Sequence, residues 1–142
     1  MNPTPNIESY LGTFNDFMTA LVRRDSPDMS ARQTTVFLAV YLNDEAQTVR
    51  GLASHLNVSK PAITRALDRL TDLQFAARKV DPSDRRSVLV QRTPKGSAFL
   101  RELRVKLAEA AAANGLGVAA PEVRRVPANN GTATRGRVAK AA

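Results

Sequence analysis

Cationic and hydroxyl side chains share one face of a short helical segment, and their chemistry suits nucleic acid. Lys60, Thr64 and Arg65 have the spacing that places side chains beside one another on a helix surface. Ammonium, guanidinium and hydroxyl groups donate hydrogen bonds to phosphate oxygens and to base edges. We therefore expect these three residues to contact bases and phosphates, and Arg69, one turn further on, to reach backbone phosphate. The alternative is an ordinary solvated helix face.

Two helical patterns joined by a very short turn position this face. Apolar residues of the first recur at i, i+3, i+4 and i+7: Val49, Leu52, Ala53 and Leu56. The second spans residues 59–73, with Ser59 suited to cap it and Pro61 in its first turn, where a missing N–H costs nothing. Its apolar positions are Ile63, Leu67, Leu70 and Leu73. Ala53 allows a close crossing and Asn57 tolerates a left-handed backbone, so the pattern predicts a helix-turn-helix.

Four more residues around this turn are candidates for DNA contacts. Thr48 and Arg50 begin the first helix and are candidate phosphate contacts. Ser59 could meet a phosphate besides capping the second helix, and Pro61 could pack against a thymine methyl group.

A hairpin is expected directly after the helix-turn-helix. The runs 75–80 and 87–91 can pair around the charged loop 81–86, whose Pro and Asp residues suit a turn. Arg85 and Arg86, at the end of that loop, could enter a narrow minor groove, where the potential is strongly negative. Asp84 could hold the guanidinium of Arg86 by a charge-assisted hydrogen bond. The alternative is an exposed turn with weak surface ion pairs.

Longer helices are expected on both sides of this unit. The first runs from residue 6 or 7 to about 24 and carries a broad apolar stripe: Ile7, Tyr10, Leu11, Phe14, Phe17, Met18, Leu21 and Val22. One small domain does not need so wide a stripe, so a partner subunit could cover part of it; the alternative is packing on its own domain. The last helix opens at Thr93-Pro94, passes through Phe99, Leu103, Leu107 and Ala110, and ends near Asn114-Gly115.

The expected fold is mainly α with a small antiparallel β-wing, that is, a winged helix-turn-helix with flanking N- and C-terminal helices. A further helix, capped by Ser30 and ending near Leu42, has Val36, Phe37, Val40 and Tyr41 as core positions, and a short strand near Thr48 extends the wing sheet. Residues 1–5 are expected to be frayed, 6–115 to form the domain, and 116–142 to be a disordered basic tail.

Charge and composition exclude several classes of protein. The 142 residues carry a net charge of +8, distributed as −3 over residues 1–47, +6 over 48–95 and +5 over the rest, as phosphate binding by one face requires. Without cysteine and with one histidine, disulfides and a zinc site are not expected. The sequence contains neither a nucleophile–base pair nor a phosphate-binding glycine loop, so neither an enzyme nor a bound cofactor is expected. No signal peptide or membrane-spanning run is present, so a cytoplasmic, nucleoid-associated protein is expected.

Residues 30–105 resemble the MarR (multiple antibiotic resistance regulator) family. The resemblance rests on SKPAITRALDRL in the presented helix, DPSDRR in the wing and LVQRTPKG after it. It implies a homodimeric, sequence-specific regulator of transcription, a repressor on a pseudo-palindromic double-stranded operator. Members usually carry another long helix after the one that ends near Asn114, and its absence here puts the standard dimer geometry in doubt. The alternative function is a winged-helix protein-interaction or unspecific chromosome-coating module.

The resemblance also implies a dimer interface and a ligand pocket. The interface is expected to use Ile7, Leu11, Phe14, Leu103 and Leu107. The pocket, for a small aromatic effector that releases DNA, is expected between the dimer-forming helices and the winged helix, at Tyr10, Phe14, Phe37 and Tyr41, with Arg23 or Arg24 pairing with a carboxylate. The alternative is that all four rings belong to the core.

Overall fold

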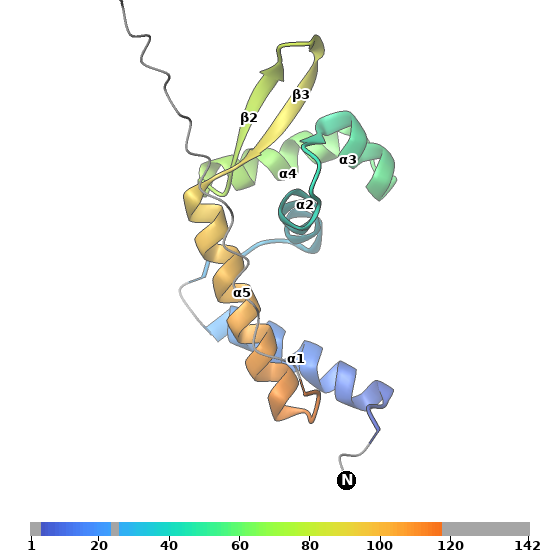
Figure 1. Ribbon diagram of the computed structural model, residues 1–142, viewed down its shortest axis with the longest axis vertical. Coiled ribbons are helices and arrows are strands. Elements are labelled where there is room, and N and C mark those ends of the chain that lie inside the picture. The colour runs from blue at the N-terminus through green and yellow to red at the C-terminus, as the bar shows by residue number, and fades with distance from the viewer. Residues whose placement is uncertain (1–3, 24–25, 118–142) are drawn as a thin grey trace, which may run out of the picture.

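The computed structural model describes residues 4–23 and 26–117, which form five α-helices and a small three-stranded sheet. The elements follow in the order α1 (Ile7–Arg23), α2 (Ala31–Leu42), β1 (Gln47–Thr48), α3 (Val49–Leu56), α4 (Lys60–Asp72), β2 (Ala76–Asp81), β3 (Asp84–Arg92) and α5 (Pro94–Ala113). Figure 1 shows α2, α3, α4 and the β2–β3 hairpin gathered at one end, with α5 leading away to α1 at the other. The expected mainly helical fold with an antiparallel wing is confirmed.

Local sequence signals start the helices where they were expected. The Ser30 hydroxyl accepts a hydrogen bond from the Gln33 amide (3.2 Å), and the Gln33 side chain accepts one from the Ser30 amide (3.0 Å), which completes a capping box. Thr48, Ser59 and Thr93 cap α3, α4 and α5 in the same manner, through amides three residues later. Each cap satisfies an amide that would otherwise lack a partner, so these boundaries are encoded locally.

The turn between α3 and α4 depends on a left-handed residue. Asn57 has φ 53° and ψ 48°, a conformation that Asn tolerates better than other side-chain-bearing residues. The Val58 amide then donates to the Ala53 carbonyl (3.1 Å), which closes the end of α3. Ala53 is buried at the crossing, so the predicted helix-turn-helix is confirmed in its details.

The wing is a three-stranded antiparallel sheet in the order β1-β3-β2. Thr48 pairs with Leu89 in β1 and β3, which confirms the short strand near Thr48. Asp81 pairs with Asp84, so the hairpin turn consists of residues 82 and 83 only. The predicted loop 81–86 was therefore too long, and Arg85 and Arg86 lie in β3. The ladder with β2 is irregular here, because the pair Val80–Val88 is followed directly by Asp81–Asp84, so residues 85–87 of β3 stand opposite no residue of β2. At the turn, the Asp81 carboxylate accepts hydrogen bonds from the Ser83 hydroxyl (2.7 Å) and amide (2.9 Å). These bonds hold the pKa of Asp81 below its ordinary value.

An aromatic cluster at the centre of the core joins α2, the wing and α5. The Phe37 ring lies 4.5 Å from Tyr41 and 5.3 Å from Phe99, and Phe75 stacks on Phe99 at 4.5 Å between ring centroids. The Tyr41 hydroxyl donates to the Phe75 carbonyl (2.7 Å) and accepts from the Thr93 amide (3.0 Å). The predicted core positions of α2 are all buried: Val36, Phe37, Val40 and Tyr41.

Close approach at this junction requires a glycine. A Cβ atom on Gly96 would lie 1.8 Å from the Tyr41 hydroxyl oxygen and 2.5 Å from the Phe75 carbonyl oxygen. Gly96 thus lets the first turn of α5 sit directly on the hydrogen bonds of Tyr41.

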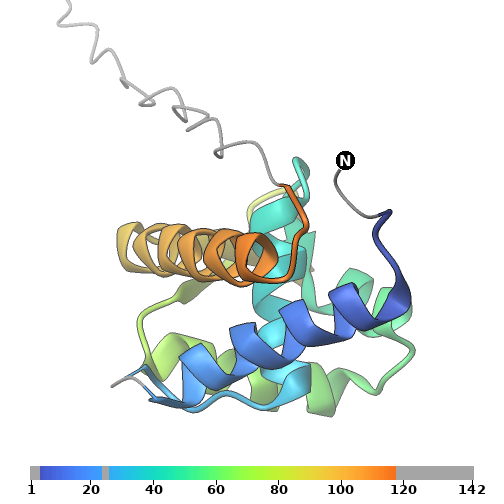
Figure 2. The same cartoon turned by 90° about the horizontal axis from the view of Figure 1, so that it is seen from below.

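Helices α1 and α5 lie against each other, away from the wing, and Figure 2 shows α5 passing alongside α1. The side-chain nitrogen Nδ2 of Asn114 donates to the Asp16 carboxylate (2.8 Å). The Oδ1 atom of Asn114 lies next to Gly12, where a Cβ atom on Gly12 would come within 2.3 Å of it. Gly115, at φ 74°, ends α5 as the Asn114-Gly115 pair predicted.

Some predictions lie outside the described residues. The frayed start falls partly on residues 1–3, and the disordered tail falls almost wholly on residues 118–142, so the division of the chain into domain and tail stays a prediction. Within the described residues, no helix is long and apolar enough to cross a membrane, and no cluster of His, Cys, Asp or Glu has the arrangement of a metal site.

Candidate nucleic-acid interface

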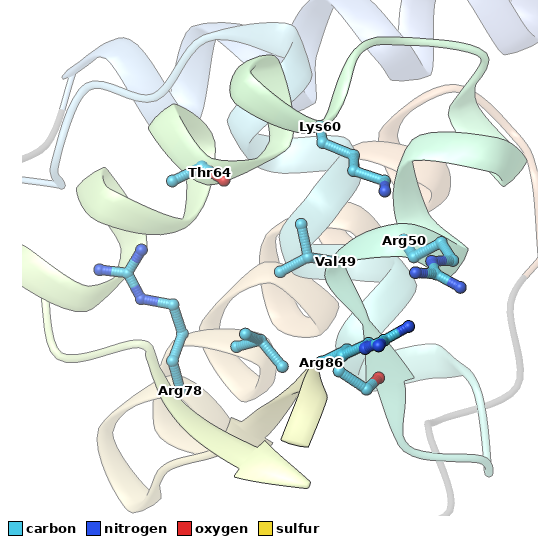
Figure 3. Close-up of a pocket in the computed structure, with 8 residues that line it drawn as sticks. Val49, Arg50, Lys60, Thr64, Arg78 and Arg86 are labelled. Carbon is cyan, nitrogen blue, oxygen red and sulfur yellow. The ribbon is translucent and has the colours of Figure 1, made fainter. Parts of the chain in front are cut away.

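Helices α3 and α4 and the wing present their free cations on one side of the molecule. Arg50 projects from the first turn of α3, Lys60 from the start of α4, and Arg86 from β3, and all three side chains are exposed. Figure 3 shows their charged ends around a common space, with Val49 between the two helices and the wing. Three separate elements thus converge into one cationic surface.

This space is a hollow of about 200 Å³. It is lined by residues from α3, α4, β2 and β3: Val49, Arg50, Lys60, Thr64, Arg78, Arg86, Ser87 and Val88. The valines give it an apolar floor, while the free cations Arg50, Lys60 and Arg86 surround it with positive charge. Phosphate oxygens entering it would find donors from several elements, which is the arrangement that backbone contacts in protein–DNA complexes use.

The presented face of α4 is free to make contacts. Lys60, Thr64 and Arg65 are exposed, whereas the opposite face buries Ile63, Leu67 and Leu70 completely. Pro61 is exposed in the first turn, where its methylene groups can meet a base. The helix is therefore amphipathic, as the sequence predicted, with Lys60, Thr64 and Arg65 on its exposed face.

The hydroxyls of the two cap residues are already engaged by the fold. The Ser59 hydroxyl accepts from the Ala62 amide (3.2 Å), and the Thr48 hydroxyl accepts from the Gly51 amide (2.9 Å). A phosphate contact by either residue would use the remaining donor capacity of its hydroxyl. Their DNA contacts stay predictions.

Arg69 lies away from the presented face. It is half-buried, and its guanidinium donates to the Asp28 carbonyl (3.3 Å) in the segment between α1 and α2. Arg69 thereby ties α4 to that segment, and a phosphate contact would use the remaining donors of its guanidinium.

Asp84 contacts Arg86 through the backbone of Arg86 and not through its guanidinium. Its carboxylate accepts a hydrogen bond from the backbone amide of Arg86 (3.1 Å), and among the described residues it forms no ion pair with the Arg86 guanidinium. The reason is local: the Asp84 carboxylate reaches the backbone amide two residues later, in the part of β3 where the register with β2 shifts. Arg85 and Arg86 are exposed beside it and keep their charged groups available.

One cation of the surface was missed by the sequence reasoning. Arg78, in β2, lines the hollow and forms an ion pair with Asp68 of α4, with 2.7 Å between Nη1 and Oδ1. The sequence signal was an arginine in a strand-like run, which does not reveal the face of the sheet it occupies. Only the pairing of β2 with β3 directs this side chain toward α4.

The predicted ligand residues do not gather into a pocket. Tyr10 and Phe14 are exposed on α1, and Arg23 is exposed at its end. Phe37 is fully buried, and Tyr41 is engaged by its two backbone partners, so both rings are core residues, as the alternative held. Burial in the core cluster does not support the expected place of Phe37 and Tyr41 in a ligand pocket.

The predicted dimer residues also divide between two environments. Ile7, Leu11 and Phe14 are exposed on α1 and Leu107 is half exposed on α5, but Leu103 is only 5% exposed. Leu103 packs into the core of its own chain, which does not support its expected place at an interface. Leu103 and Leu107 are one turn apart, and the core reaches only the former.

Comparison with known proteins connects this geometry to a family. Residues 28–87, from just before α2 into β3, match the sequence model of the MarR family. A comparison with curated proteins found no match.

Several solved structures are similar. One is the transcriptional repressor CouR bound to a 23-mer DNA duplex, with 25% identity and a TM-score of 0.59 over 75% of this chain and 72% of that chain. Another is wild-type MarR from E. coli in its apo form, with 25% identity and a TM-score of 0.58 over 74% and 75%. A third is the transcriptional regulator BldR from Sulfolobus solfataricus, with 29% identity and a TM-score of 0.54 over 72% and 70%. With its exposed α4, its three-stranded wing and the contact between α1 and α5, this chain has the fold of the MarR-type winged helix-turn-helix transcription regulators, and residues 28–87 match the sequence model of that family.

Proposed function

We propose that the protein is a homodimeric, sequence-specific repressor that binds a pseudo-palindromic site on double-stranded DNA. The observation that carries the proposal is the single exposed surface on which the face of α4 and the wing arginines lie together. A regulator of this family is not an enzyme, so its effect on transcription has to come from occupying DNA.

In the proposed complex, α4 enters the major groove. A helix with its side chains is about 10–12 Å wide, which matches a groove about 12 Å wide. Lys60, Thr64 and Arg65 would then face base edges, and Arg50 would meet the phosphates that border the groove. The similarity to CouR, whose structure contains a DNA duplex, supports binding to double-stranded DNA.

The wing would contact the neighbouring minor groove. Arg85 and Arg86 lie next to the two-residue turn at the tip of the hairpin, and both are exposed. A narrow minor groove has an enhanced negative potential that attracts an inserted arginine. The guanidinium of Arg86 also borders the hollow, so the same residue could alternatively reach a phosphate there.

The proposed dimer rests on the apolar surface of α1. Large apolar side chains remain exposed along this helix, among them Ile7 (67%), Phe14 (61%) and Val22 (80%). A contiguous apolar stripe of this kind on a soluble protein marks an interaction surface. A second copy is the fitting partner, because a two-fold dimer presents two recognition helices to two half-sites, about 34–36 Å apart for adjacent turns of DNA.

Control by a small aromatic ligand is a separate part of the proposal, supported by the family resemblance alone. A ligand releases DNA only if it binds more tightly to a dimer whose recognition helices are wrongly spaced. A screen of aromatic acids by thermal shift, followed by DNA release, tests this part. Ligands that raise Tm but leave DNA affinity unchanged would contradict it.

The main proposal is tested by selecting bound fragments from genomic DNA and measuring affinity for them by fluorescence anisotropy. Specific complexes typically bind about 10³–10⁷-fold more tightly than random DNA, so binding should survive an excess of random competitor. Light scattering on the same sample should give a dimer. Binding that random DNA removes would instead support the unspecific chromosome-coating module.

A further inference from the structure

The carboxylate of Asp68 lies at the edge of the cationic surface and forms an ion pair with one of its arginines. Lys60, Thr64 and Asp68 follow one another at intervals of four residues, so they form a row along one face of α4. Lys60 and Thr64 line the hollow, and Asp68 continues the row beyond it. The row therefore runs from a cation, through a hydroxyl, to an anion.

Asp68 meets the wing at the end of this row. The Arg78 guanidinium, which also lines the hollow, lies 2.7 Å from the Asp68 carboxylate oxygen. Figure 3 shows the Arg78 side chain extending from the wing toward α4, on the side of the hollow opposite Arg50. The ion pair thus bridges the recognition helix and the wing at the edge of the surface.

Arg78 differs from the other cations of this surface. In the part of the chain that the structure describes, Arg50, Lys60 and Arg86 have no carboxylate within ion-pair distance, whereas Arg78 does. A free cation that neutralises a phosphate releases a counterion and adds affinity for any DNA sequence. A cation already paired with a carboxylate adds less, and the carboxylate itself repels phosphates.

We propose that Asp68 is a positioning residue that holds Arg78 away from the DNA backbone and so lowers affinity for random sequence. The proposal rests on the DNA-binding function proposed above and assigns Asp68 to its specificity. Sequence-independent affinity comes mainly from phosphate neutralisation, so withholding one cation widens the ratio between specific and random binding.

The test uses Asp68→Asn, which keeps the shape of the side chain and removes its charge. On a random duplex, the released Arg78 should add about one phosphate contact, which steepens the plot of log affinity against log salt by about 0.9. Raising salt from about 50 to about 200 mM should then weaken random binding about 3.5-fold more than in the wild type. The ratio of specific to random affinity should fall.

Two further variants separate release of Arg78 from the simple loss of a negative charge. Asp72→Asn removes the same charge from the same helix at an exposed position outside the ion pair, and it should leave the slope unchanged. Arg78→Gln should leave the wild-type slope nearly unchanged but should abolish the steepening caused by Asp68→Asn.

The outcomes are distinguishable from a failure of the proposed function. If the wild type shows no preference for any DNA sequence, the proposed function fails and the specificity role of Asp68 fails with it. If the wild type binds specifically but Asp68→Asn leaves the slope unchanged, only the role of Asp68 is overturned. That role is also overturned if the steepening persists in the double variant, because Arg78 would then not be its source.

Discussion

Replacing Tyr41 with phenylalanine tests whether this residue is part of the framework that joins the DNA-binding unit to α5. The hydroxyl donates to the Phe75 carbonyl at 2.7 Å and accepts from the Thr93 amide at 3.0 Å. Tyr41→Phe removes both bonds while keeping the ring that stacks on Phe37 at 4.5 Å. The change in stability therefore reports the hydroxyl alone.

The expected loss follows from the surroundings of the two backbone groups. The hydrogen bond to Phe75 is buried and the one from Thr93 is partly buried, so water cannot fully replace the lost partner. Leaving such groups unsatisfied costs about 1–3 kcal/mol. We expect the free energy of unfolding to fall by about 2 kcal/mol and Tm to fall by several degrees.

Urea unfolding followed by circular dichroism measures this loss. The protein concentration has to be the same for both proteins, because the stability of a dimer depends on it. The slope of free energy against urea should not change. Tyr10→Phe is the matched control, since Tyr10 is exposed on α1 and should lose less than about 0.5 kcal/mol. A loss in Tyr41→Phe as small as that of the control would refute the reasoning.

Three further predictions concern DNA binding and assembly. Lys60→Ala and Arg65→Ala should each weaken operator binding in an anisotropy titration, by about 1–3 kcal/mol where a bidentate guanine contact is lost, without changing Tm; unchanged affinity in both would remove α4 from the interface. Arg86→Ala should lose more affinity on sites with A·T-rich flanks than on G·C-rich ones, and equal losses would mean that Arg86 touches phosphate only. Phe14→Glu should shift the protein from dimer to monomer in light scattering, whereas Asn15→Glu next to it should not; a dimeric Phe14→Glu variant would place the interface elsewhere.

Local interactions made most of the fold predictable from the sequence. The caps at Ser30, Ser59 and Thr93 act through amides three residues away, so the boundaries they set do not depend on the rest of the chain. Asn57 adopts the left-handed conformation that the short turn between α3 and α4 requires. The helix-turn-helix and the presented face of α4 followed from these signals and from helical periodicity, as did the candidate residues Lys60, Thr64 and Arg65.

The tertiary structure determined the strand register and which residues of each helix are buried. The register of β2 on β3 directs Arg78 to Asp68, and its shift next to the turn leaves Arg86 in an irregular part of β3; no local pattern specifies that register. Packing into the core cluster separates buried Leu103 from exposed Leu107, although both continue the same helical spacing. Periodicity identifies the apolar face of a helix, but the surfaces that pack against it determine which of its residues are buried.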